Sequence, residues 1–242
     1  MGDVAVTAPA LLRSTDPYLD LLKVLEEKLN KQDARAKFFD RYYEGTQPLS
    51  FMAPEVIKQV GDRLAPVVIN WPRVIVDSVQ RRCTVQGFRM GSSGALDEDL
   101  WSLWSRSGMP SWSRMNHVDS LVHRLTFWSV WADDTQAPAI APESAHQMAV
   151  LHAAGSDRVR AALKRFVDDD DVMRAYLFLP DRVRKYSAAN SQGLALVGSV
   201  ARWQLDEELP NPLGAVPVVP MVNRPRVLNL DGESELADVI PL

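Results

Sequence analysis

The stretch PYLDLLKVLEEKLNKQDARAKFFDRYYEG, residues 17–45, decides the first half of the fold. Apolar residues recur in it at helical spacing, at Tyr18, Leu21, Leu22, Leu25 and Leu29, and the stripe continues to Phe39 and Tyr43. Thr15 or Asp16 can cap a helix at its start. Pro17 suits the first helical turn, and Gly45 suits the position after the last one. The sequence therefore predicts one long amphipathic helix, from about Thr15 to Tyr43, that packs through its leucines.

The following segments predict further helices. Asn70 can cap a helix that carries Pro72 in its first turn. Helical patterns also cover residues 94–108 and residues 111–125. The proline-containing link before Asn70 includes a short helical pattern at residues 54–60. The first half of the chain is therefore expected to be mainly helical.

The second half reads mostly as short strands. Strand-like patterns occur at residues 84–88, 127–133, 137–142, 147–153 and 196–208. Residues 172–188 predict two strands that turn at Pro180, and prolines keep residues 211–232 extended. Residues 156–171 differ, because they predict a capped helix, or a turn and helix, that ends in four aspartates. This order predicts an α+β fold, with N-terminal helices followed by short, mostly antiparallel strands.

Composition argues against several classes of protein. The 242 residues carry a net charge of -4, whereas non-specific nucleic-acid binding needs a basic surface. The single cysteine, Cys83, allows no internal disulfide and fits a reducing compartment. No run approaches the roughly 18 apolar residues of a membrane span, and the N-terminus lacks a signal-peptide pattern. We expect a globular intracellular protein with a sizeable core and no membrane partner.

Motifs that carry chemistry are missing. The histidines, His117, His123, His146 and His152, lack the spacing of zinc-binding motifs. No glycine-rich phosphate loop and no nucleophile elbow is present, and Cys83 lies at a predicted helix C-terminus, which disfavours a thiolate. The sequence therefore predicts no catalytic residue, no cofactor and no metal ligand. As an alternative, Asp168–Asp171 could belong to a small intracellular hydrolase, although four adjacent carboxylates are more typical of a solvated turn.

Five of the seven tryptophans crowd into one stretch, at positions Trp101, Trp104, Trp112, Trp128 and Trp131. They can form a core cluster or a subunit interface, since aromatic side chains anchor both. Both interpretations stay open, with the core favoured.

Six segments, taken together and in order, carry a family resemblance: residues 41–51, 68–89, 100–109, 117–131, 175–186 and 211–242. Their motif positions are Tyr42, Tyr43, Gly45, Asn70, Arg73, Asp77, Gly87, Phe88, Gly214, Pro217, Asn223, Arg224, Gly232, Ser234 and Glu235. The chain resembles the portal proteins of SPP1-like tailed phages, above all those of phages that infect actinobacteria. The resemblance runs from about Tyr18 to Leu242 and matches the N-terminal half of such proteins.

The motif residues suit structural roles. Arg73 and Asp77 are four positions apart on one helix face and can pair. Gly87 can close a strand tightly, and Gly214 with Pro217 can shape a turn into an extended segment. Glu235 is placed to interact with the amide end of a helix. None of these arrangements is catalytic.

The resemblance implies a structural virion protein and no enzyme. Portal proteins of this family form a ring, typically a dodecamer, at one capsid vertex, where they serve genome packaging, head assembly and head–tail connection. The implied partners are the terminase large subunit, capsid and scaffolding proteins, the head–tail connector protein, and double-stranded DNA in the tunnel. The implied location is the virion, and the bacterial host cytoplasm during assembly.

Family members are about double this length, which suggests a division of the chain. We expect a flexible N-terminus at residues 1–14, a portal wing-like domain at residues 15–231, and at residues 232–242 the start of a helix that leads to an absent stem. A truncated gene, a split reading frame and a partial sequence would all end in this way. Because ring contacts through the stem and clip would be missing, we expect a monomer or a small, weak oligomer. Because isolated short helices are marginal in water, we expect its C-terminus to be frayed.

Overall fold

The computed structural model describes residues 17–47, 70–91, 94–132, 135, 137–188 and 203–240. The helices of these ranges are α1 (Pro17–Glu44), α3 (Trp71–Gln80), α4 (Glu98–Arg106) and α5 (Met109–His123). The strands are β1 (Leu125–Ala132), β2 (Pro138–Glu143), β3 (Met148–His152), β4 (Val159–Val167), β5 (Met173–Phe178), β6 (Arg182–Ala188), β7 (Gln204–Pro210) and β8 (Val218–Val222). The helices precede the strands, so the predicted α+β class is confirmed.

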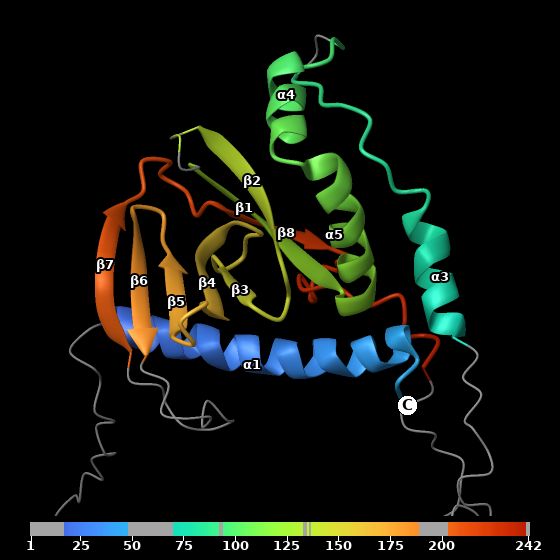
Figure 1. The fold of residues 1–242 in the computed structure, drawn as a ribbon, viewed down its shortest axis with the longest axis horizontal. Coiled ribbons are helices and arrows are strands. Elements are labelled where there is room, and N and C mark those ends of the chain that lie inside the picture. The colour runs from blue at the N-terminus through green and yellow to red at the C-terminus, as the bar shows by residue number, and fades with distance from the viewer. Residues whose placement is uncertain are drawn as a thin grey trace, which may run out of the picture.

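The strands form two antiparallel sheets. The smaller sheet has the order β2-β1-β8, and the larger has the order β3-β4-β5-β6-β7. Figure 1 shows α1 running along one edge of the molecule, with the larger sheet over its first half and with α3 and one end of α5 beside its other end; α4 lies beyond α5, away from α1. The long helix therefore joins the larger sheet to the helical part.

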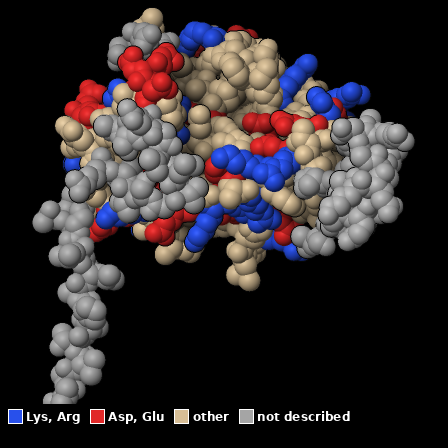
Figure 2. Space-filling view, turned by 60° about the horizontal axis from the view of Figure 1, so that its bottom comes forward, with Lys and Arg blue, Asp and Glu red and all other residues tan. Residues whose placement is uncertain are grey.

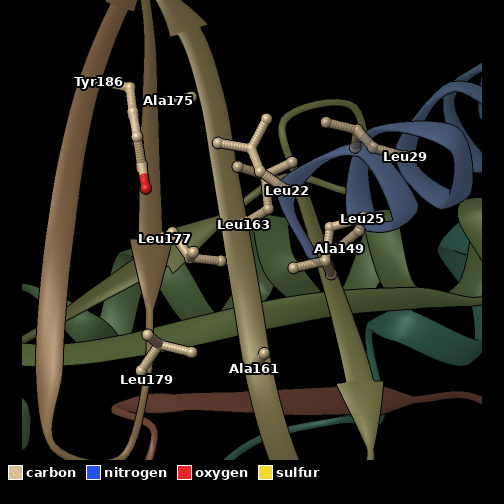
Figure 3. Packing of buried hydrophobic residues seen from close by; sticks show 10 residues of the cluster. All are labelled: Leu22, Leu25, Leu29, Ala149, Ala161, Leu163, Ala175, Leu177, Leu179 and Tyr186. Carbon is tan, nitrogen blue, oxygen red and sulfur yellow. The ribbon is translucent and has the colours of Figure 1, made fainter. Parts of the chain in front are cut away.

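The main core lies between α1 and the larger sheet (Figure 3). Leu22, Leu25 and Leu29 are fully buried, and they pack on strand residues that include Ala149, Leu163 and Leu177. The predicted leucine face is therefore confirmed for these three residues, whereas Leu21 is only partly buried at the edge of the cluster. The positions of Thr15 and Asp16 lie outside the described residues.

The helix predicted for residues 156–171 is wrong. These residues contain strand β4 and the turn that follows it. β4 lies between β3 and β5. Ala161 and Leu163 face α1, while Ala162 lies in a second cluster with residues of β1 and β8. Because both faces of this strand are covered, its apolar residues run together and do not alternate. Its alanines, leucine and basic residues are also good helix formers, so local propensity pointed to the wrong element.

Two other predictions also change. Residues 84–88, predicted as a strand, belong to no described sheet; the backbone oxygen of Phe88 accepts from the amide of Asp97 at 2.9 Å. Helix α5 ends at His123 because Arg124 adopts a left-handed conformation with φ of 78°. The short helix predicted at 54–60 lies outside the described ranges. No helix in the described part of the chain combines the length and apolar character that a membrane crossing requires.

Candidate functional site: the junction at the end of α1

Four segments that are distant in sequence meet at the C-terminal end of α1 (Figure 1). Their buried side chains form one apolar cluster, which we call the junction: Phe39, Val76, Leu121, Val122, Leu236 and Ile240. Tyr42 and Tyr43 are partly buried against it. The junction therefore combines α1, α3, α5 and the segment that follows β8.

Hydrogen bonds between α1 and α3 use the predicted motif residues. The Asn70 side chain donates from Nδ2 to the Tyr43 carbonyl at 2.7 Å, and its Oδ1 accepts from the Arg73 amide at 3.1 Å. Asn70 thus caps α3 as predicted. The Tyr43 hydroxyl donates to Asp77 Oδ1 at 2.9 Å, and burial together with this carboxylate raises the pKa of Tyr43. Gly45 ends α1 with φ of 76°.

The predicted Arg73–Asp77 pair is present, but its atoms are 3.9 Å apart and its arginine is exposed. The guanidinium also lies 5.4 Å from the centre of the Tyr43 ring. Exposed pairs of this kind contribute little stability. The closer partner of Asp77 is therefore Tyr43, which sequence spacing did not indicate.

A second group of motif residues fixes the segment after β8. Asn223 donates from Nδ2 to the Glu233 carbonyl at 2.8 Å and to Glu235 Oε1 at 3.0 Å. The Leu121 carbonyl, in the last turns of α5, accepts from the Glu235 amide at 2.9 Å and the Ser234 hydroxyl at 3.2 Å. Because carbonyls at a helix end lack partners within the helix, these bonds attach the segment to α5.

Around Ser234 the backbone departs from the predicted helix start. Residues 235–239 form consecutive turns, and Ser234 accepts at Oγ from the Leu236 amide at 3.1 Å. Glu235 bonds the Asn223 side chain and thereby differs from the helix-end role expected for it. Ser234 and Leu236 are fully buried. Up to Ile240 the segment is packed on the junction, and residues 241–242 lie outside the described ranges.

The remaining motif residues lie elsewhere. The Phe88 ring packs edge-on against Trp104, with centroids 5.3 Å apart, and Gly87 precedes it. Gly214 adopts φ of 64° in the connection between β7 and β8, and the Pro217 carbonyl accepts from a β1 amide. Arg224 forms an ion pair with the exposed carboxylate of Asp238 at 3.1 Å. The structure therefore brings most, but not all, motif residues together.

The tryptophans divide between the two interpretations. Trp104 is buried and contacts Trp128, with ring centroids 5.2 Å apart. Trp101 and Trp112, in α4 and α5, are exposed by 38% and 48%. The core interpretation therefore holds for Trp104, and the two exposed rings leave the interface interpretation open.

The aspartates of the hydrolase alternative form the turn between β4 and β5. Asp168 accepts at Oδ1 from the Val172 amide at 2.8 Å and at Oδ2 from Arg174 Nε at 2.7 Å, and these bonds lower its pKa. A neighbouring cavity of about 340 Å³ is lined by Phe166, Asp168, Arg174, Tyr176, Lys185, Asp206 and Glu207. The lining contains no histidine, serine, threonine or cysteine, its hydroxyl group is that of Tyr176, and the turn geometry accounts for the carboxylates.

A cluster of ionisable residues beside the junction was missed by sequence reasoning. Asp40 lies in α1, His123 ends α5, and His146 lies in the turn between β2 and β3. His123 Nε2 is 2.6 Å from Asp40 Oδ1, and His146 Nε2 is 3.0 Å from Asp40 Oδ2. His146 Nδ1 is 2.7 Å from Asp33 Oδ1. Because these residues are far apart in sequence, no spacing motif could reveal the cluster.

The charges of this cluster hold His146 in its protonated form. The hydrogen bond to Asp40, opposed by burial and aided by Asp33, raises the pKa of His146 to about 9. Burial opposes ionisation of Asp40, but the hydrogen bonds from His123 and His146 outweigh it and lower the pKa of Asp40. Burial raises the pKa of Asp119, which lies near the same groups. The imidazolium of His146 thus bridges two carboxylates.

The shifted pKa of His146 predicts that stability falls as pH rises. Since the folded pKa of about 9 exceeds the unfolded value of 6.5, the stabilisation is complete below pH 6.5 and is lost as pH rises through about 9. Allowing for solvent screening, we expect a loss of about 1–2 kcal/mol in the free energy of unfolding. Urea denaturation with a chelator, between pH 6 and about 10, measures it. His146→Gln should remove this pH-dependent loss, whereas His152→Gln should retain it. If the free energy of unfolding changed equally with pH in the parent protein and both variants, the assignment would be contradicted.

Comparisons with known proteins agree with the resemblance. The profile of the family described as phage portal protein, SPP1 Gp6-like, matches residues 22–242. The portal protein of Mycobacterium phage L5 is 29% identical over 205 residues, which cover 81% of this chain and 40% of that protein. The portal protein of Mycobacterium phage D29 is 27% identical over 245 aligned residues, which cover 97% of this chain and 46% of that protein. The chain spans less than half the length of these curated relatives. Because the family profile covers nearly all of it, the chain belongs to the SPP1 Gp6-like family of phage portal proteins.

Proposed function

We propose that the chain is a structural part of a phage portal, as a subunit or as the N-terminal portion of one. The observation that carries this proposal is the family match over residues 22–242. In this role it contributes to a ring at one capsid vertex, which serves genome packaging, head assembly and head–tail connection. It acts by binding and packing, and it is not an enzyme.

The geometry of the junction supports a structural role for the motif residues. Asn70, Tyr43 and Asp77 connect two helices, Ser234 attaches the segment after β8 to a third, and Asn223 binds Glu233 within that segment. Their polar atoms are directed at one another and at backbone groups. These residues therefore fix the relative positions of elements that a large assembly needs to hold constant.

The proposed partners are other copies of the portal subunit in a ring of about twelve, the terminase large subunit, capsid and scaffolding proteins, and the head–tail connector protein. Double-stranded DNA would pass through the ring. On the face shown in Figure 2, acidic and basic side chains are interspersed and neither sign covers the surface. With a net charge of -4, such a surface suits a conduit that does not retain DNA.

Immunoelectron microscopy tests the proposed location. Gold-labelled antibodies raised against residues 17–240 are applied to phage particles produced by cells that carry the gene. Label at a single capsid vertex is the expected result. Label spread over the whole head, or protein recovered only outside particles, would contradict the proposal. Pre-immune antibodies applied to the same particles control for specificity.

A further inference from the structure

Three side chains beside the junction direct potential metal ligands at one another. Asp40, His123 and His146 each offer one ligand atom, and these atoms lie within 4.8 Å of one another. They come from α1, α5 and the turn between β2 and β3. None of the three is a family-motif position, and the junction hydrogen bonds do not use them.

The donor set determines which ions fit. Two imidazole nitrogens and one carboxylate suit zinc and related first-row dications, whereas calcium and magnesium prefer oxygen ligands alone. In a tetrahedral zinc site, neighbouring donor atoms lie about 3.3 Å apart. The two histidine nitrogens face different oxygens of Asp40, at 2.6 and 3.0 Å, and these distances need to open by less than about 1 Å for an ion to enter.

The surroundings already orient His146 for this purpose. Asp33 Oδ1 lies 2.7 Å from Nδ1 of His146, and Lys37 holds the other oxygen of Asp33 at 2.8 Å. A carboxylate behind a histidine fixes the ring so that its second nitrogen faces the ion. Gln32 donates to the carbonyls of Ala145 and Met148, at 2.6 and 2.7 Å, and so fixes the turn on both sides of His146.

The buried ring of His123 directs one nitrogen at Asp40. The side chain of His123 is only 5% exposed, and its Nδ1 has no hydrogen-bond partner among the described residues. The polar contact of this buried ring is therefore made through Nε2, which faces Asp40. The rings of His123 and His146 stand edge to face with centroids 4.9 Å apart. The Nε2 atoms of both rings therefore lie close to the Asp40 carboxylate.

Charge balance favours a dication at this position. When an ion binds both Nε2 atoms, the protons that those atoms carry are released to solvent or, for His123, one moves to Nδ1. The imidazoles are then neutral, and Asp33 and Asp40 place two negative charges near the ion, of which that of Asp33 is also paired with Lys37. The side chains of Asp40 and His146 are each 29% exposed, which leaves a path from solvent and a fourth position for water.

We propose that Asp40, His123 and His146 form a binding site for a zinc-class dication that cross-links α1, α5 and the β2–β3 turn, with Asp33 positioning His146. The site is independent of the proposed portal function. Binding would stabilise the folded chain beside the junction, since an ion that binds only the folded state adds to stability.

Titration of the tag-free, chelator-treated protein tests the site. With Zn²⁺ we expect calorimetric saturation at one ion per chain and a melting temperature that rises with ion concentration. Mg²⁺ should give neither effect. With Co²⁺, the visible spectrum should show the intense bands of a tetrahedral site with nitrogen and oxygen ligands. Absence of saturation by Zn²⁺ up to about 1 mM, a concentration well above that at which histidine sites fill, would overturn the proposal.

Single substitutions locate the ion. His123→Gln, His146→Gln and Asp40→Asn should each weaken binding by more than about 100-fold, and Asp33→Asn by about 10- to 100-fold. His152→Gln and Cys83→Ser are matched controls that should bind like the parent protein. Circular dichroism of the metal-free variants verifies folding. Unchanged binding in His146→Gln, or thiolate bands in the cobalt spectrum that vanish in Cys83→Ser, would place the ion elsewhere and refute the site.

Discussion

Leu25→Ala is expected to lower the free energy of unfolding by about 2–5 kcal/mol, because it removes a fully buried side chain and leaves a cavity. Leu25 belongs to the cluster in which α1 packs on β3, β4 and β5. Figure 3 shows Ala149 beside Leu25, and its methyl group is too short to fill the space. The loss should therefore fall toward the upper part of this range. Chemical denaturation at constant pH measures it.

Val24→Ala is the matched control on the same helix. Val24 is 51% exposed, so its truncation should change the free energy of unfolding by less than about 0.5 kcal/mol. Similar values for the two variants would show that the leucine face does not form the core. The dependence of the free energy of unfolding on denaturant concentration should be the same in the parent protein and in both variants. Equal values would show that the unfolded states are comparable.

Gly232→Ala is expected to destabilise the protein by about 2–5 kcal/mol, through backbone strain and steric overlap together. Gly232 has φ of 71°, in the left-handed region. A Cβ atom there would collide with the carbonyl oxygen of Asn223 and lie 2.6 Å from Cγ1 of Val222. Because β8 pairs with β1, the Asn223 backbone has little freedom to move away. The segment after Gly232 should then detach from Leu121.

Gly214→Ala separates the two causes. Gly214 has a similar φ of 64°, but a Cβ atom there meets nothing within 4 Å. This variant should show the strain alone, about 1–2 kcal/mol. Hydrogen exchange of the Glu235 amide, which donates to the Leu121 carbonyl, should accelerate in Gly232→Ala and not in Gly214→Ala. Equal stability and equal exchange in both variants would contradict the close contact at Gly232.

The elements that sequence reasoning predicted are those whose local pattern matches their environment. α1 has solvent on one side and a sheet on the other, so its leucine stripe is visible as a periodicity. The cap at Asn70 depends only on residues three positions apart. The prediction for β4 was wrong because a strand covered on both faces does not alternate apolar and polar residues. The covering elements are distant in the chain.

The candidate site shows the same division. Resemblance identified the motif residues, but their partners come from other elements: Tyr43 with Asp77, Asn223 with Glu235, and Ser234 with Leu121. The cluster of Asp40, His123 and His146 has no local signal, since its members stand on a helix, a helix end and a turn. Such convergence depends on topology, which a single sequence does not display.

Because α1 is long, a small rotation at one of its ends displaces the other end. At 1.5 Å per residue, its 28 residues span about 42 Å, with the leucines near one end and Phe39 near the other. A rigid rotation of about 5° around the leucines would shift the other end by about 2–3 Å. A small tilt of α1 against the larger sheet would therefore move α3 and α5 by about the size of an atom. No part of α1 would need to unfold.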